Sequence, residues 1–153
     1  MIELSACKAI VRGLRDGRLT TADCRLLAAV RLLQALASVA VAWGSVPAAR
    51  RILSGIRPSS HFICGFASER QIIRALEASA RLHGNRRSCL ARALTAELLL
   101  ESTPVTVVIG VRPSTGGRLE SHAWVEREGS VLIGGHDSPV EYTRMIAWSS
   151  GPA

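Results

Sequence analysis

VTVVIGV at residues 105–111 decides the fold, because the spacing of apolar residues changes there. Before it, apolar residues such as Leu26, Val30 and Leu33 recur at the three- and four-residue steps of a helix. The stretch itself is rich in β-branched residues and is long enough for a buried strand. Helices followed by strands predict an α+β fold, in which a helical N-terminal half is followed by an antiparallel sheet.

The residues around this stretch place the other elements. A long helix is expected to begin at Thr20 or Thr21, with Asp23 in its first turn, and to end at Gly44 and Pro47. Further helices are expected over residues 69–82 and from Cys89 to about Glu101, and further strands over residues 119–126 and 131–133.

These elements predict a helical N-terminal region over residues 1–60 and a core over residues 61–153. Residues 56–66 contain proline, serine and glycine and are expected to connect the two. A chain of 153 residues fits a single domain of ordinary size, so we expect one compact unit.

The composition indicates a globular protein with an aliphatic core. Hydrophobic residues make up 48% of the chain and aromatic residues only 4%. The net charge of +7 favours an acidic peptide or an acidic protein as a partner. Nucleic acid is disfavoured, because the arginines are spread along the chain without the aromatic residues that stack bases.

A charge-free stretch at residues 32–49 raises the question of a membrane span. Gln34, Gly44 and Pro47 interrupt it, so a buried or interface-facing helix fits better, and we expect no transmembrane span. Docking on a partner or loose attachment to a membrane surface stays open for this helix. The N-terminal residues lack the pattern of a signal peptide, so we expect a cytoplasmic protein.

The four cysteines indicate free thiols. Cys7, Cys24, Cys64 and Cys89 form no C-x-x-C pair and no short Cys/His cluster. Neither a metal site nor a disulfide framework is therefore indicated, and we expect no cofactor.

Cys89 and His122 lie in settings that together suggest a nucleophile and its base. Cys89 opens an apolar helix-patterned run, where the helix dipole lowers the pKa of a thiol. His122 lies in an extended run and could take or return the proton. The N–H of Cys89 is a candidate oxyanion donor, and Asn85 is a second candidate from the preceding loop. The competing interpretations are a buried, inert cysteine and a turn residue at Asn85.

The register of an expected hairpin assigns the third catalytic role to Asp137. With a two-residue loop at 128–129, Trp124 pairs with Ile133. Side chains alternate along strands, so Asp137 then faces the same side as His122 at a main-chain distance of about 7 to 8 Å.

Two alternatives depend on the same register. Glu126 shares the face of His122, but four residues along a strand span about 13 Å, which is too far for a hydrogen bond. A slip of one residue would turn Asp137 away and bring His136 to the face of His122.

Three segments of the chain resemble the lasso peptide leader peptidases, a family of transglutaminase-like cysteine proteases. They are RRSCLARAL at residues 86–94, VVIGV at 107–111 and SHAWVE at 121–126. The resemblance implies a papain-like or transglutaminase-like core with Cys89 as nucleophile and His122 as base. The family's acidic member usually follows the histidine strand closely, whereas here Gly134-Gly135 come first and the first carboxylate is Asp137.

The resemblance also implies a function and partners. The family removes the leader from a ribosomally made precursor peptide, so that an ATP-dependent cyclase can close the ring on the freed amine. A chain this short looks like the stand-alone split form, in which a separate leader-binding protein presents the precursor. The expected partners are the precursor's leader region and that protein, and an association with the cyclase stays open.

Two other functions remain open on the sequence alone. The chain could be a non-catalytic scaffold that holds the precursor and its partner together. It could also transfer the acyl group to an amine instead of to water, because both reactions share a thioester intermediate.

Overall fold

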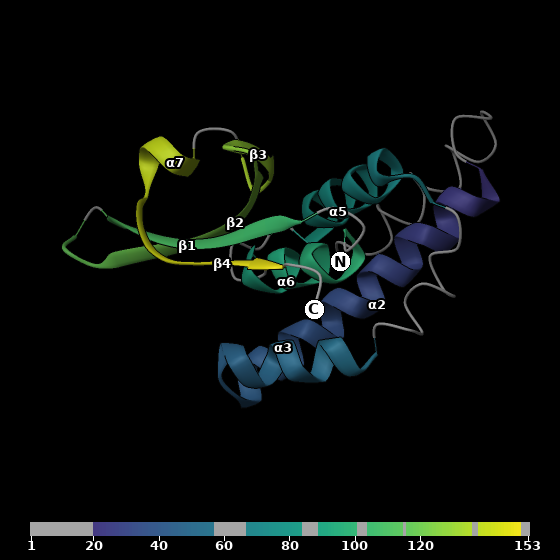
Figure 1. The fold of residues 1–153 in the computed structure, drawn as a ribbon, viewed down its shortest axis with the longest axis horizontal. Coiled ribbons are helices and arrows are strands. Elements are labelled where there is room, and N and C mark those ends of the chain that lie inside the picture. Colours follow the sequence, from purple (N-terminus) through teal and green to yellow (C-terminus); the bar gives the residue numbers. More distant parts are fainter. Residues whose placement is uncertain are drawn as a thin grey trace.

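The computed structural model describes residues 20–56, 67–83, 89–100, 104–114, 116–135 and 138–150. Its elements are the helices α2 (Thr21–Trp43), α3 (Val46–Gly55), α5 (Glu69–His83) and α6 (Cys89–Leu99), then the strands β1 (Val105–Pro113), β2 (Leu119–Arg127) and β3 (Ser130–Ile133), and finally the short helix α7 (Ser138–Glu141) and the strand β4 (Thr143–Ser150). The predicted α+β fold, with helices first and an antiparallel sheet after them, is confirmed. In Figure 1 the four longer helices gather beside the sheet.

The long helix α2 begins and ends where the sequence predicts. The side chain of Thr20 accepts a hydrogen bond from the N–H of Asp23 at 3.1 Å, and the Asp23 carboxylate accepts one from the N–H of Thr20 at 2.8 Å. This reciprocal capping box satisfies two amides that the helix itself leaves unpaired. Gly44 ends the helix, and Pro47 lies in the first turn of α3, where its missing N–H costs nothing.

One large hydrophobic cluster joins α2, α5 and α6 to the sheet. Its buried members include Val30 of α2, Leu76 of α5, Ala96 of α6, and Val107 and Val125 of β1 and β2. The core therefore contains residues from both sides of the predicted boundary after residue 60, and that boundary itself lies outside the described residues. A second cluster packs α2 and α3 against α6.

Among the described residues, helix α2 is long and apolar enough to cross a membrane, as judged by length and composition alone. A third of its most apolar window, 33%, is buried inside the protein, and a core helix passes the same test. Leu32, Leu36, Val39 and Trp43 are exposed on the part of α2 that the core does not cover.

The sheet has the order β3-β2-β1-β4, with every neighbouring pair antiparallel. The strand β4 was not predicted, and it extends the sheet on the free side of β1. Six of its eight residues are exposed, so it lacks the alternation of buried and exposed positions that reveals a half-buried strand. The short helix α7 was also missed, because four residues are too few for a helical period.

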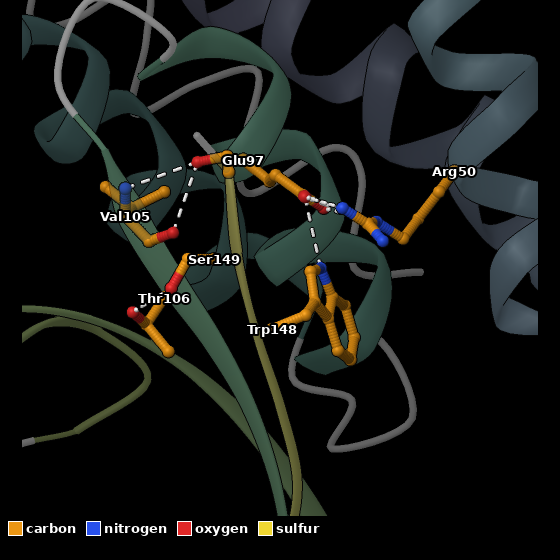
Figure 2. A network of polar contacts seen from close by, with 7 residues as sticks. Arg50, Glu97, Val105, Thr106, Trp148 and Ser149 are labelled. Atoms are coloured by element: carbon orange, nitrogen blue, oxygen red, sulfur yellow. Dashed lines mark hydrogen bonds and ion pairs between the residues drawn. The ribbon is translucent and has the colours of Figure 1, made fainter. Parts of the chain in front are cut away.

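A polar network ties β4 to the helices (Figure 2). Buried Glu97 of α6 accepts hydrogen bonds from Arg50 of α3 at 2.6 Å and from the indole N–H of Trp148 of β4 at 3.1 Å. The guanidinium of Arg50 also lies over the Trp148 ring, 5.1 Å from its centre. These contacts fix the C-terminal strand against two helices.

The hairpin between β2 and β3 differs from the predicted register. Arg127 pairs with Ser130 as expected, but Ile133 pairs with Val125 and not with Trp124. The ladder shifts between Val125 and Glu126, where β3 contains one extra residue and forms a β-bulge. The predicted Trp124–Ile133 pairing is therefore wrong.

This bulge removes the alternation argument that placed Asp137 on the face of His122. An inserted residue reverses which face each following position takes. Asp137 and His136 lie outside the described residues, so the role of Asp137 stays a prediction.

Candidate active site

Cys89 is the first residue of α6, and its side chain is partly buried between that helix and β2. The first amides of a helix have no partner within it and carry the positive end of the helix dipole. A sulfur at this position is therefore held where negative charge is stabilised.

The thiol of Cys89 and the imidazole of His122 form a hydrogen bond. Burial raises the pKa of the Cys89 thiol, but the hydrogen bond from His122 and those from the main-chain N–H groups of Ala123 and Leu90 lower it. The net effect is a pKa below that of an ordinary cysteine. Cys89 is thus set up to ionise more easily than a free thiol.

The pKa of His122 moves in the opposite direction. The hydrogen bond with Cys89 raises it, burial lowers it, and a hydrogen bond to the carbonyl of Gly134 raises it. The positive charge of Arg92, one turn further along α6, partly opposes the rise. A lowered thiol pKa and a raised imidazole pKa both favour a thiolate–imidazolium pair, which is the reactive form of a cysteine nucleophile.

The geometry of β2 explains how the main chain reaches the sulfur. The ladder between β2 and β3 begins only at Val125, so β3 does not cover this edge of β2 at Ala123. The N–H of Ala123 can therefore donate a hydrogen bond to the sulfur of Cys89. The short β3 strand leaves room for the nucleophile beside the histidine strand.

The second ring nitrogen of His122 has its own partner. Nε2 lies 2.7 Å from the carbonyl oxygen of Gly134. A carbonyl can only accept, so Nε2 must carry the hydrogen. Nδ1 is then the nitrogen left to exchange a proton with Cys89.

Aromatic rings surround the imidazole. The ring of Tyr142 lies 5.1 Å from that of His122, and the ring of Trp124 is stacked at 6.2 Å. The guanidinium of Arg112 lies 4.6 Å from the centre of the Tyr142 ring and pairs with the carboxylate of Glu141 at 2.6 Å. These contacts restrict the rotation of the histidine side chain.

The other predicted residues are not brought to this pair by the described part of the chain. Asn85 and Asp137 both lie outside it. Glu126 is buried, and its two carboxylate oxygens have other partners, the indole N–H of Trp124 at 2.6 Å and the guanidinium of Arg144 at 3.1 Å.

Sequence reasoning did not find three contributors to the site. Gly134 supplies a main-chain atom, which no side-chain pattern reveals, although its double-glycine setting does indicate an unusual backbone. Tyr142 reaches His122 through the unpredicted α7–β4 segment. Arg92 lies one turn after Cys89 in the run that suggested the nucleophile, and its spacing alone was a usable signal.

No group of three His, Cys, Asp or Glu side chains that could hold a metal ion occurs among the described residues. The chemistry that the pair itself supports is nucleophilic attack by sulfur with proton transfer through the imidazole. The N–H of Cys89, at the start of α6, remains the candidate oxyanion donor.

A comparison with family models agrees with this chemistry. The model of the transglutaminase-like superfamily matches residues 20–147, which is most of the chain. The protein belongs to this superfamily, whose usual activities are those of cysteine proteases and acyltransferases. No curated protein and no solved structure matched the chain.

Proposed function

We propose that this protein is a cysteine peptidase that removes the leader from a ribosomally made lasso precursor peptide. The observation that carries the proposal is the hydrogen-bonded pair of Cys89 and His122 at the start of α6, in a chain of the transglutaminase-like superfamily. The segments around both residues, which resemble the lasso leader peptidases, support the specific substrate.

The pair has the arrangement that peptide cleavage needs. The Cys89 thiolate attacks the carbonyl carbon at the end of the leader, and the N–H of Cys89 stabilises the resulting oxyanion. The His122 imidazolium then protonates the leaving amine of the core peptide as the carbon–nitrogen bond breaks. The leader remains as a thioester, and water, deprotonated by His122, releases it as a carboxylic acid and restores the thiol.

The partners follow from the same proposal. A separate leader-binding protein presents the precursor in the cytoplasm, and an ATP-dependent cyclase acts on the freed amine afterwards. The net charge of +7 supports an acidic peptide or protein as one of these partners. Asp137, which the sequence offers for the third catalytic role, lies outside the described residues, so the proposed scheme assigns chemical steps only to Cys89 and His122.

The test combines precursor, leader-binding protein and this protein, each alone and together, with the products followed by mass. The complete mixture should release the leader, and Cys89→Ala should abolish release. Cys24→Ala is the matched control, because Cys24 is another free, partly buried thiol on a different helix, and it should retain full activity. Leader release by Cys89→Ala would refute the proposal.

Acyl transfer to an amine is the second candidate, because the superfamily also contains acyltransferases. The same thioester would then react with an amine in place of water. Adding an excess of a simple amine such as glycine amide separates the two. A transferase yields the leader amide as the main product, whereas a peptidase yields the free leader acid.

A further inference from the structure

The residue after β3 has a backbone that only glycine allows. Gly134 has φ +111°, and a Cβ added to it would lie 2.5 Å from the Cβ of Trp124 and 2.9 Å from its Cα. Both the positive φ and the close approach exclude a larger residue. The main chain of Gly134 is therefore packed tightly against β2, the strand that carries His122.

This contact aims the Gly134 carbonyl at two donors. Nε2 of His122 donates to it at 2.7 Å, and the hydroxyl of Ser138 donates to it at 2.9 Å. A carbonyl oxygen has two lone pairs, so these two hydrogen bonds use its full capacity.

Ser138 is itself firmly placed. It is only 5% exposed, and its N–H donates to the carbonyl of Gly135 at 3.2 Å. Its own carbonyl accepts from the N–H of Tyr142 at 3.0 Å, which brings the Tyr142 ring to the imidazole. One turn of chain thus fixes both the acceptor at Nε2 and a ring against which His122 packs.

We propose that the main-chain carbonyl of Gly134, held by the hydroxyl of Ser138, orients His122 in the role that a carboxylate has in a catalytic triad. This inference deepens the proposed function, on which it rests for its meaning in catalysis. Gly134 and Ser138 are positioning residues, because they act on the substrate only through His122. Asp137 is then not needed for the orientation of the imidazole.

A carbonyl and a carboxylate differ in what they give the imidazole. Both accept from Nε2 and so fix the tautomer that presents Nδ1 to the thiol. Only the carboxylate adds a full negative charge, and changing it to an amide in a serine protease triad lowers kcat by about 10⁴-fold. The neutral Asp137→Asn substitution therefore distinguishes the two acceptors.

The experiment measures two rates for each variant. The first is alkylation of Cys89 by dilute iodoacetamide across pH 5 to 10, assigned by mass mapping, which needs neither substrate nor partner. The second is leader release with precursor and leader-binding protein. The variants are Asp137→Asn, Ser138→Ala and, as a matched control for loss of a carboxylate, Glu128→Gln in the exposed β2–β3 turn.

Asp137→Asn should stay within about threefold of the parent protein in both rates, as Glu128→Gln should. Ser138→Ala should move the alkylation profile to higher pH and slow both reactions at neutral pH by about three- to tenfold, because the carbonyl loses one of its two anchors. A loss of more than tenfold in leader release by Asp137→Asn, with a displaced alkylation profile, would overturn the inference. So would an unchanged profile in Ser138→Ala.

The two proposals can fail separately. If the parent protein shows an alkylation profile shifted below that of free cysteine and yet releases no leader, the proposed function fails while the alkylation arm still decides the role of Gly134. Asp137→Asn preserves the size of the side chain, and circular dichroism and thermal unfolding confirm that each variant is folded before its rates are compared.

Discussion

The two edges of the sheet differ in how far they are paired and in what anchors them. On one edge β4 pairs with β1 from Val105 to Val111, with one register shift between Ile109 and Gly110, and the Glu97 network anchors it to two helices. On the other edge β3 pairs with β2 at only three positions, contains a bulge and is followed by Gly134 and Gly135, which both have positive φ. The candidate active site lies at the β3 edge, where main-chain groups of β2 and Gly134 that are not paired in the ladder contact the thiol and the imidazole.

This difference suggests a division of roles. The β4 edge holds the sheet against the helices, whereas the β3 edge presents polar main-chain groups that a longer ladder would have paired. Substitutions at the first edge should change stability, and substitutions at the second should change the reactivity of Cys89.

The largest effect is expected from His122→Ala. Removal of a general acid–base usually costs about 10²- to 10⁴-fold in rate, and here it also removes the hydrogen bond that lowers the pKa of Cys89. Leader release should fall by that order, and alkylation of Cys89 at neutral pH should fall with it. Undiminished alkylation in this variant would mean that the helix start alone activates the sulfur.

Gly134→Ala should have the next largest effect. The added Cβ would meet Trp124 at 2.5 Å, and a non-glycine residue at this positive φ costs about 1–3 kcal/mol in stability. Gly117→Ala is the matched control, because Gly117 also has a positive φ but nothing within 4 Å of an added Cβ. Chemical denaturation and Cys89 alkylation should both be affected more by Gly134→Ala; equal effects would show that backbone strain alone is responsible.

The pH dependence of leader release should be bell-shaped. Because the pKa of Cys89 is lowered, leader release should begin to rise at a pH below that at which a free thiol ionises. Because the pKa of His122 is raised, the imidazolium that protonates the leaving amine should persist to a higher pH than that of a free histidine. On each outer side of the bell, the rate of leader release should change by about tenfold per pH unit. A rate of leader release, measured as kcat/KM, that only rises up to pH 9 would contradict a preformed ion pair.

The smallest effect on reactivity is expected at the β4 edge. Glu97→Gln weakens the contacts of a buried carboxylate with Arg50 and Trp148, and because Arg50 is partly exposed the loss in unfolding free energy should be about 1–2 kcal/mol. The alkylation profile of Cys89 should not move, and Glu77→Gln on α5 serves as the control. A shifted profile would show that the two edges are coupled.

Much of the fold could be predicted because the helices α2, α5 and α6 and the first three strands have strong local signals. The cap formed by Thr20 and Asp23, the helix at 69–83 and the β-branched run at 105–111 each follow from neighbouring residues. The strand β4 could not be predicted, since it pairs with a strand more than 30 positions earlier and is mostly exposed.

The candidate site likewise has one part with local sequence signals and one part without them. The settings of Cys89 and His122 are local, and the sequence predicts both. The acceptor for Nε2 depends on a bulge in β3 and on the path of the chain after Ile133, neither of which alternation of side chains can indicate. A main-chain acceptor such as the Gly134 carbonyl leaves no mark in a sequence, in which only side chains differ between positions.

An acceptor made of peptide backbone has a consequence for how the site would be mapped. Systematic truncation of side chains would identify the sulfur and the imidazole as indispensable but would return no third member. The acceptor is the main-chain carbonyl oxygen of residue 134, which is present whatever residue occupies that position. A mutation there changes only whether the chain can follow its present path. Replacing that peptide bond by an ester would weaken the carbonyl as an acceptor and probe it without touching any side chain.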